Sequence, residues 1–100
     1  MNKVVIDTSL ANKIKVILNV GKEVFTKESE QKFGSQALLG SITELIEQSG
    51  IEFKDLTTIE VATGPGSYTG LRVGVSVANA LSYSLGIPVN GKTIETEVVY

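Results

Sequence analysis

The chain has 100 residues, no cysteine, no histidine and a formal net charge of −2, with a pI of about 5.1. These totals exclude disulfides, cysteine or histidine metal sites, thiolate catalysis and an imidazole base. They also argue against a module that binds nucleic acid through a basic surface. The short apolar run at the N-terminus is broken by Asp7 and is no signal peptide, and no apolar run approaches the ~20 residues that span a bilayer, so we expect a cytoplasmic protein.

Three antiparallel strands are predicted in the first 27 residues. Residues 3–7 are rich in β-branched side chains, and residues 13–20 alternate in places between polar and apolar. A turn at 19–22 leads to a third strand over 23–27. The polar segment 28–34 is predicted to be a loop.

The rest of the chain alternates helices and strands. The apolar spacing predicts a helix over 35–49 with Ser35 as N-cap, a strand over 58–63 and a helix over 67–85. A last short strand begins at Ile87. The order βββαβαβ implies a mixed α/β sheet with parallel pairing across the helical crossovers.

Two units follow from this order. We expect residues 1–90 to form one lobe. Residues 91–100 are either the start of a connection to a missing second lobe or a free tail, and Thr93 is a candidate N-cap for a helix that opens there.

The most distinctive segment is the glycine-rich stretch 63–74, which follows a strand and opens a helix. Backbone N–H groups in such a turn can hold a phosphate, here around Gly64 and Gly66. However, Gly70 lies one position late for a dinucleotide fingerprint, Leu71 stands where a P-loop has lysine, and Pro65 has no N–H. A tight strand-to-helix turn is therefore the favoured interpretation, and phosphate binding is the alternative.

Small residues recur every fourth position along the second helix, at 70, 74, 78, 82 and 86. Such a stripe lets another backbone approach closely, either the domain's own sheet and first helix or a helix of another subunit. We favour the contact between subunits, which predicts these interface residues: Gly70, Val73, Gly74, Val77, Ala78, Leu81 and Ser82.

Polar residues at two other positions are candidates for chemistry. Asp7, Thr8 and Ser9 end the first strand and could hold magnesium, a catalytic water or a phosphate, although an aspartate there is more often a turn former. Arg72 lies in the first turns of a helix, where the dipole disfavours a cation, so it is either solvated or paired with an acidic group nearby or on a partner.

Residues 5–9 (VIDTS) and 64–74 (GPGSYTGLRVG) resemble the N-terminal lobe of the TsaB family, which usually has Phe where Tyr68 stands. The resemblance covers roughly residues 3–92. It implies a ribonuclease-H-like lobe of the actin, sugar-kinase and Hsp70 superfamily: a βββαβαβ mixed sheet with two helices. Family members normally carry a second lobe, which is absent here.

The resemblance also implies a function. The family supports formation of threonylcarbamoyladenosine at position 37 of tRNA as a non-catalytic partner of TsaD, paired through the two lobe helices and joined by the ATPase TsaE. Family members also form homodimers through this surface. We therefore expect no catalytic or metal-binding residue, only indirect contact with tRNA, no membrane contact and, despite the older name glycoprotease, no peptidase chemistry. The alternative is an ATPase-like lobe that binds ATP or ADP with magnesium at the subunit interface, through Asp7 and the turn 64–70.

Overall fold

The computed structural model describes residues 1–30 and 34–99. Four strands form one sheet in the order β3-β2-β1-β4, with β1 antiparallel to β2, β2 antiparallel to β3, and β1 parallel to β4. The predicted meander, the crossover and the α/β class are confirmed. The elements are β1 (Asn2–Asp7), β2 (Lys13–Val20), β3 (Glu23–Glu30), α1 (Gly34–Ser49), the 3₁₀ helix η2 (Phe53–Asp55), β4 (Thr58–Val61) and α2 (Tyr68–Leu85).

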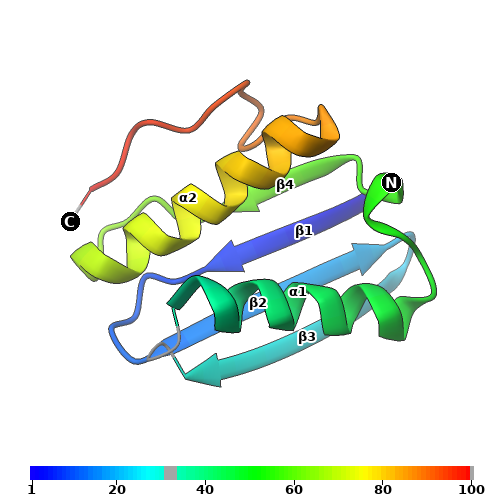
Figure 1. The fold of residues 1–100 in the computed structure, drawn as a ribbon, viewed down its shortest axis with the longest axis horizontal. Coiled ribbons are helices and arrows are strands. Elements are labelled where there is room, and N and C mark those ends of the chain that lie inside the picture. The colour runs from blue at the N-terminus through cyan, green and yellow to red at the C-terminus, as the bar shows by residue number, and fades with distance from the viewer. Residues whose placement is uncertain (31–33, 100) are drawn as a thin grey trace.

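Both α-helices cover the same face of the sheet (Figure 1), α1 over β2 and β3 and α2 over β4 and β1. Alternate strand residues point into this layer, as the period of two in a strand requires, and are buried; examples are Val4, Ile6, Val16 and Leu18. The helices contribute the apolar side of their surface to the same core. In the part of the chain that the structure describes, no helix combines the length and apolarity needed to cross a membrane.

Five element boundaries differ from prediction. β1 begins at Asn2, one residue early, and α2 begins at Tyr68, one residue late, because Ser67 is its N-cap. β3 continues to Glu30, because Lys13 to Val20 of β2 pair with it along their whole length; the predicted loop is wrong over 28–30, and its residues 31–33 lie outside the described residues. α1 begins at Gly34, one residue before the predicted N-cap. β4 ends at Val61 rather than at residue 63.

The predicted last strand is reduced to a single bridge between Val89 and Ile59. Asn90 adopts a left-handed φ of 51° and turns the chain away after this bridge. Its side chain then makes the next two ladder bonds itself, accepting from Val61 N at 2.8 Å and donating to Val61 O at 3.1 Å. An amide side chain thus replaces the backbone of a fifth strand.

The helix predicted to open at Thr93 is absent: residues 93–99 contain no helix and run back alongside α2 towards its first turns (Figure 1). The backbone of Glu95 is held instead by the side chain of Asn79 in α2. Glu95 N donates to Asn79 Oδ1 at 2.9 Å, and Asn79 Nδ2 donates to Glu95 O at 2.9 Å. This reciprocal pair keeps the segment extended.

Candidate functional site

The loops after the parallel strands β1 and β4 meet at one edge of the sheet, beside the start of α2. Ser67 N donates to Ser9 O at 2.8 Å. Gly66 lies so close to this loop that a Cβ on it would be 2.5 Å from Ser9 O. The structure therefore brings the predicted loop residues together, but they pack against one another.

Asp7 acts as a turn former. Its carboxylate accepts a bond of 2.9 Å from Ser9 N and one of 2.6 Å from Ser9 Oγ. Thr8 is fully buried beneath α2, where a Cβ on Gly74 would be 2.2 Å from Thr8 Oγ1. These three residues close the β1 loop onto the helix.

Gly64 also allows another part of the chain, Val99, to approach the backbone closely. Its φ of +116° is one that side chains rarely adopt, and a Cβ there would be 1.8 Å from the carbonyl oxygen of Val99. Gly66 and Gly74 thus lie against the loop after β1, at Ser9 and Thr8, and Gly64 lies against Val99 near the end of the chain. This explains the glycine density of the stretch without a ligand.

Some groups of the turn that could meet a phosphate already have partners within the chain. Gly70 N, a backbone donor in the first turn of α2, bonds the Ser67 hydroxyl at 3.2 Å, which caps α2. Pro65 offers no N–H, and the space beside Gly66 holds Ser9. Within residues 1–30 and 34–99, no group of three or more acidic side chains is placed to hold a metal ion.

The small-residue stripe of α2 faces inward. Gly70, Gly74, Ala78 and Ser82 are buried by the chain itself, and Ser82 Oγ donates to the carbonyl of Ile87. The interpretation that the stripe packs on its own domain therefore holds for these four residues, and Val77 is buried with them. Among the predicted interface residues, only Val73 and Leu81 remain partly exposed.

A different set of residues forms the outer surface of the helix layer. We call it the outer helix face, and all of its members are exposed: Gln36, Leu39, Gly40 and Glu47 of α1, and Tyr68, Arg72, Ser76, Ala80 and Tyr83 of α2. Three are large and apolar or aromatic, with exposed fractions of 43% for Leu39, 55% for Tyr68 and 90% for Tyr83. Gly40, Ser76 and Ala80 are the small residues of this face, and Gln36, Glu47 and Arg72 make it partly polar.

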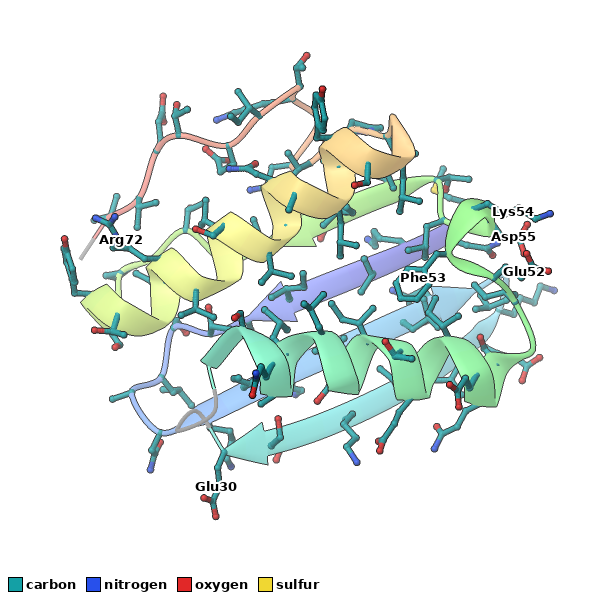
Figure 2. The ribbon with its side chains drawn as sticks, viewed as in Figure 1. Glu30, Glu52, Phe53, Lys54, Asp55 and Arg72 are labelled. Atoms are coloured by element: carbon teal, nitrogen blue, oxygen red, sulfur yellow. The ribbon has the colours of Figure 1, made fainter. Side chains whose placement is uncertain are left out.

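A hollow of about 380 Å³ opens between the starts of the two helices, lined by Ser35 and by residues of α2 from Tyr68 to Ser76. Arg72, labelled in Figure 2, stands at this end of α2. Its guanidinium lies 5.3 Å from the centre of the Tyr68 ring and donates to the Tyr68 hydroxyl at 2.9 Å. It has no acidic partner among the described residues, so its positive charge faces outward.

A second polar cluster was not predicted from the sequence. The buried carboxylate of Glu95 accepts bonds from Asn90 Nδ2 at 2.8 Å, Glu97 N at 3.0 Å and Lys92 Nζ at 3.1 Å. The bond from Asn90 is the largest cause that lowers the pKa of Glu95 to about 2; burial opposes it, and the other two bonds add to it. The only sequence signal was an Asn-Gly turn followed by a Lys-x-x-Glu spacing at 92 and 95.

Comparisons with known proteins agree with this fold. A solved structure described as YeaZ from Pseudomonas aeruginosa superposes with a TM-score of 0.82 at 25% identity, over 89% of this chain and 43% of that one. The TsaB protein of Bacillus subtilis is 39% identical over 67 residues, which is 66% of this chain and 29% of the relative. The TsaB protein of Haemophilus influenzae is 30% identical over 84 residues, 84% of this chain and 36% of the relative.

The chain spans about a third of the length of these curated relatives. Both relatives are tRNA threonylcarbamoyladenosine biosynthesis proteins. The family described as TsaD, tRNA N6-adenosine threonylcarbamoyltransferase, matches residues 24–91, which is more than half of the chain. The chain therefore belongs to this family, and within it is a TsaB-like and YeaZ-like protein.

Proposed function

We propose that this chain takes part in the threonylcarbamoyladenosine modification of tRNA as a non-catalytic partner of a TsaD-like catalytic subunit. The proposal rests on the family match and on the similarity to TsaB proteins of tRNA threonylcarbamoyladenosine biosynthesis. The observation that carries the partner role is the outer helix face, which exposes the large side chains of Leu39, Tyr68 and Tyr83. The absence of histidine from the sequence and the filled glycine turn favour a binding role over a catalytic one.

Gly40 supports a helix contact on this face. It lies in the interior of α1, where glycine costs about 1 kcal/mol relative to alanine. Nothing in the described part of the chain requires it, because a Cβ there would meet none of the described atoms within 4 Å. Ser76 and Ala80 are small and exposed on the neighbouring helix. Small residues in these positions allow the backbone of a partner helix to approach closely.

The charges on the face point to the same conclusion. Arg72 lies near the positive end of the α2 dipole, and Glu47 lies in the last turn of α1, at its negative end. Each position is unfavourable by about 0.3–1 kcal/mol, and neither has an ion-pair partner among the described residues. A partner with an acidic group opposite Arg72 and a basic group opposite Glu47 would offset both terms.

Two copies of the chain in antiparallel orientation would also supply these charges to each other, so we propose self-association through the same face in the absence of the catalytic subunit. A TsaE-like ATPase would join through the complex, and tRNA contact would be indirect. Both remain proposals that follow from the family.

Binding to a purified TsaD-like subunit tests the proposal. Ala80→Arg, which places a long charged side chain in the outer helix face, should weaken binding at least about tenfold by calorimetry, as expected for a disrupted interface centre. Thr26→Arg is the matched control, because Thr26 is exposed on the sheet face without helices. Equal binding by both variants would rule out the outer helix face as the contact surface.

The role in modification needs its own assay. In cells depleted of their TsaB protein, this chain should restore threonylcarbamoyladenosine, measured by mass spectrometry of digested tRNA, and Ala80→Arg should restore less than Thr26→Arg. Binding without restoration would keep the interface and reject the role in modification.

A further inference from the structure

The outer edge of β4 is closed by segments that are not strands. Ile59 N donates to Pro88 O at 3.0 Å, and Asn90 N donates to Ile59 O at 2.8 Å. Val61 is the next residue of β4 whose backbone faces this edge, and the Asn90 side chain bonds both its N–H and its carbonyl. Two residues further, Thr63 O accepts from Val99 N at 2.7 Å. Three separate pieces of the C-terminal segment therefore take the place of one strand.

Residues 91–99, which we call the strap, make the last of these contacts. The backbone groups of successive residues point to opposite sides of an extended chain. Ala62 N bonds Ile6 O of β1, so the backbone of the next residue, Thr63, faces the outer edge where the strap lies. The carbonyl oxygen of Val99 occupies the space beside Gly64 where a side chain would stand. The strap thus covers both the end of β4 and the glycine turn.

Apart from the turn bonds between Lys92 and Val89 and the bond from Val99 N, the attachment of the strap is concentrated at Glu95. Glu95 is 4% exposed and Val98 is half-buried, but the other seven residues of the strap are exposed. The carboxylate of Glu95 accepts three hydrogen bonds, and its backbone makes two with Asn79. A segment with so few buried apolar contacts has little to hold it once these bonds are lost.

We propose that the strap is a reversible cover over the end of β4 and the glycine turn, latched by Glu95. In the latched state the outer edge at Thr63 and the backbone of Gly64 are closed to other molecules. Release removes the cover while the sheet and both helices stay folded, because the strap supplies only Val98 to the border of the core. The inference is independent of the proposed role in tRNA modification.

Amide hydrogen exchange measured by NMR tests the proposal. In the unaltered chain, the Val99 amide should be protected, but less than the Ala62 amide, which bonds β1. Glu95→Ala should lower the protection of Val99 at least about tenfold, the effect expected when a buried charged acceptor is removed. The protection of Ala62 should stay the same. Thr96→Ala, at an exposed position of the strap, should change neither amide.

A second variant approaches the same contact from the turn. Gly64→Ala places a methyl group where the Val99 carbonyl lies and should release the strap without any change at Glu95. Gly21→Ala is the control, since Gly21 also has a positive φ, +58°, but has no atom within 4 Å of a Cβ. The proposal is overturned if Val99 and Ala62 show equal protection in the unaltered chain, or if Glu95→Ala and Gly64→Ala both leave the Val99 amide as protected as before.

Discussion

The two interior glycines of the helices provide a sharp test of the packing. Gly40 in α1 and Gly74 in α2 both have ordinary helical backbone, and neither is at a helix end. We expect substitution by alanine to change stability in opposite directions at the two sites. The backbone cost that alanine removes is the same, so only the surroundings differ.

At Gly40 the added methyl group meets nothing within 4 Å and stays in solvent. Gly40→Ala should therefore stabilise the monomer by about 0.5–1 kcal/mol, the usual gain from replacing glycine in a helix. For a domain of this size, that corresponds to a rise of roughly 2–8 °C in Tm.

At Gly74 the methyl group would be 2.2 Å from Thr8 Oγ1 and 3.3 Å from both Thr8 Cβ and Thr8 Cγ2. Thr8 is fully buried and its side chain is branched at Cβ, so it cannot swing away as the end of a long side chain would. Overpacking of this kind costs about 1–3 kcal/mol. After the helix gain of about 1 kcal/mol is subtracted, Gly74→Ala should destabilise the chain by up to about 2 kcal/mol.

Urea unfolding followed by circular dichroism at low protein concentration measures both values, because the midpoint multiplied by the slope m gives the free energy of unfolding. The double variant Thr8→Ala/Gly74→Ala should be more stable than the sum of the two single changes by about 1 kcal/mol or more, since the first change makes room for the second. If Gly74→Ala stabilises the chain as much as Gly40→Ala does, α2 does not lie against the β1 loop as described.

Three further outcomes are expected. Ser82→Ala should cost about 1–2 kcal/mol, because the buried hydroxyl bonds the carbonyl after α2, whereas Ser84→Ala, at an exposed position, should be within about 0.5 kcal/mol of the unaltered chain in urea unfolding. Asn90→Ala and Asn90→Gly should both lower Tm in calorimetry, because both lose the two bonds to Val61 and the bond to Glu95. The alanine variant should have the lower Tm of the two, because glycine adopts the positive φ of this position with less strain. Since the pKa of Glu95 falls from 4.5 to about 2 on folding, its contribution to the free energy of unfolding is fully present above pH 4.5 and is lost as the pH falls towards 2. The stability of Glu95→Gln, measured over the same acid range, should lack this loss. An identical acid profile in both chains would show that Glu95 is not bonded as described.

Much of the fold follows from local pattern. The β-branched run of β1, the alternation in β2 and the apolar stripe of α1 each depend on residues close in sequence, and these elements formed where expected. The predictions of a last strand and of a helix at Thr93 were wrong for a different reason. Asn90 and Glu95 are fixed by bonds to Val61 and Asn79, which are 29 and 16 residues away, and no local pattern predicts such contacts.

The sequence also did not predict which side of α2 packs on the sheet. Two sides of α2 are non-polar: a row of large residues (Val73, Val77, Leu81 and Leu85) and the stripe of small ones. Spacing alone does not say which of them packs on the sheet. The answer depends on Thr8, whose fully buried position under Gly74 requires a helix surface without side chains. The resemblance to TsaB indicated the two helices as a contact surface, but not which sides of them are exposed.

The inward direction of the stripe changes how substitutions in α2 must be interpreted. A bulky residue at Gly74 would disturb the β1 loop before it reached any partner, so a loss of binding in that variant would report misfolding. Gly40, Ser76 and Ala80 are exposed and lie outside the core, so a loss of binding after a bulky substitution there would report a lost contact and not misfolding. The glycine stretch packs against the β1 loop and Val99 of its own chain, whereas the outer helix face lies on the opposite side of the same helix layer, away from the sheet.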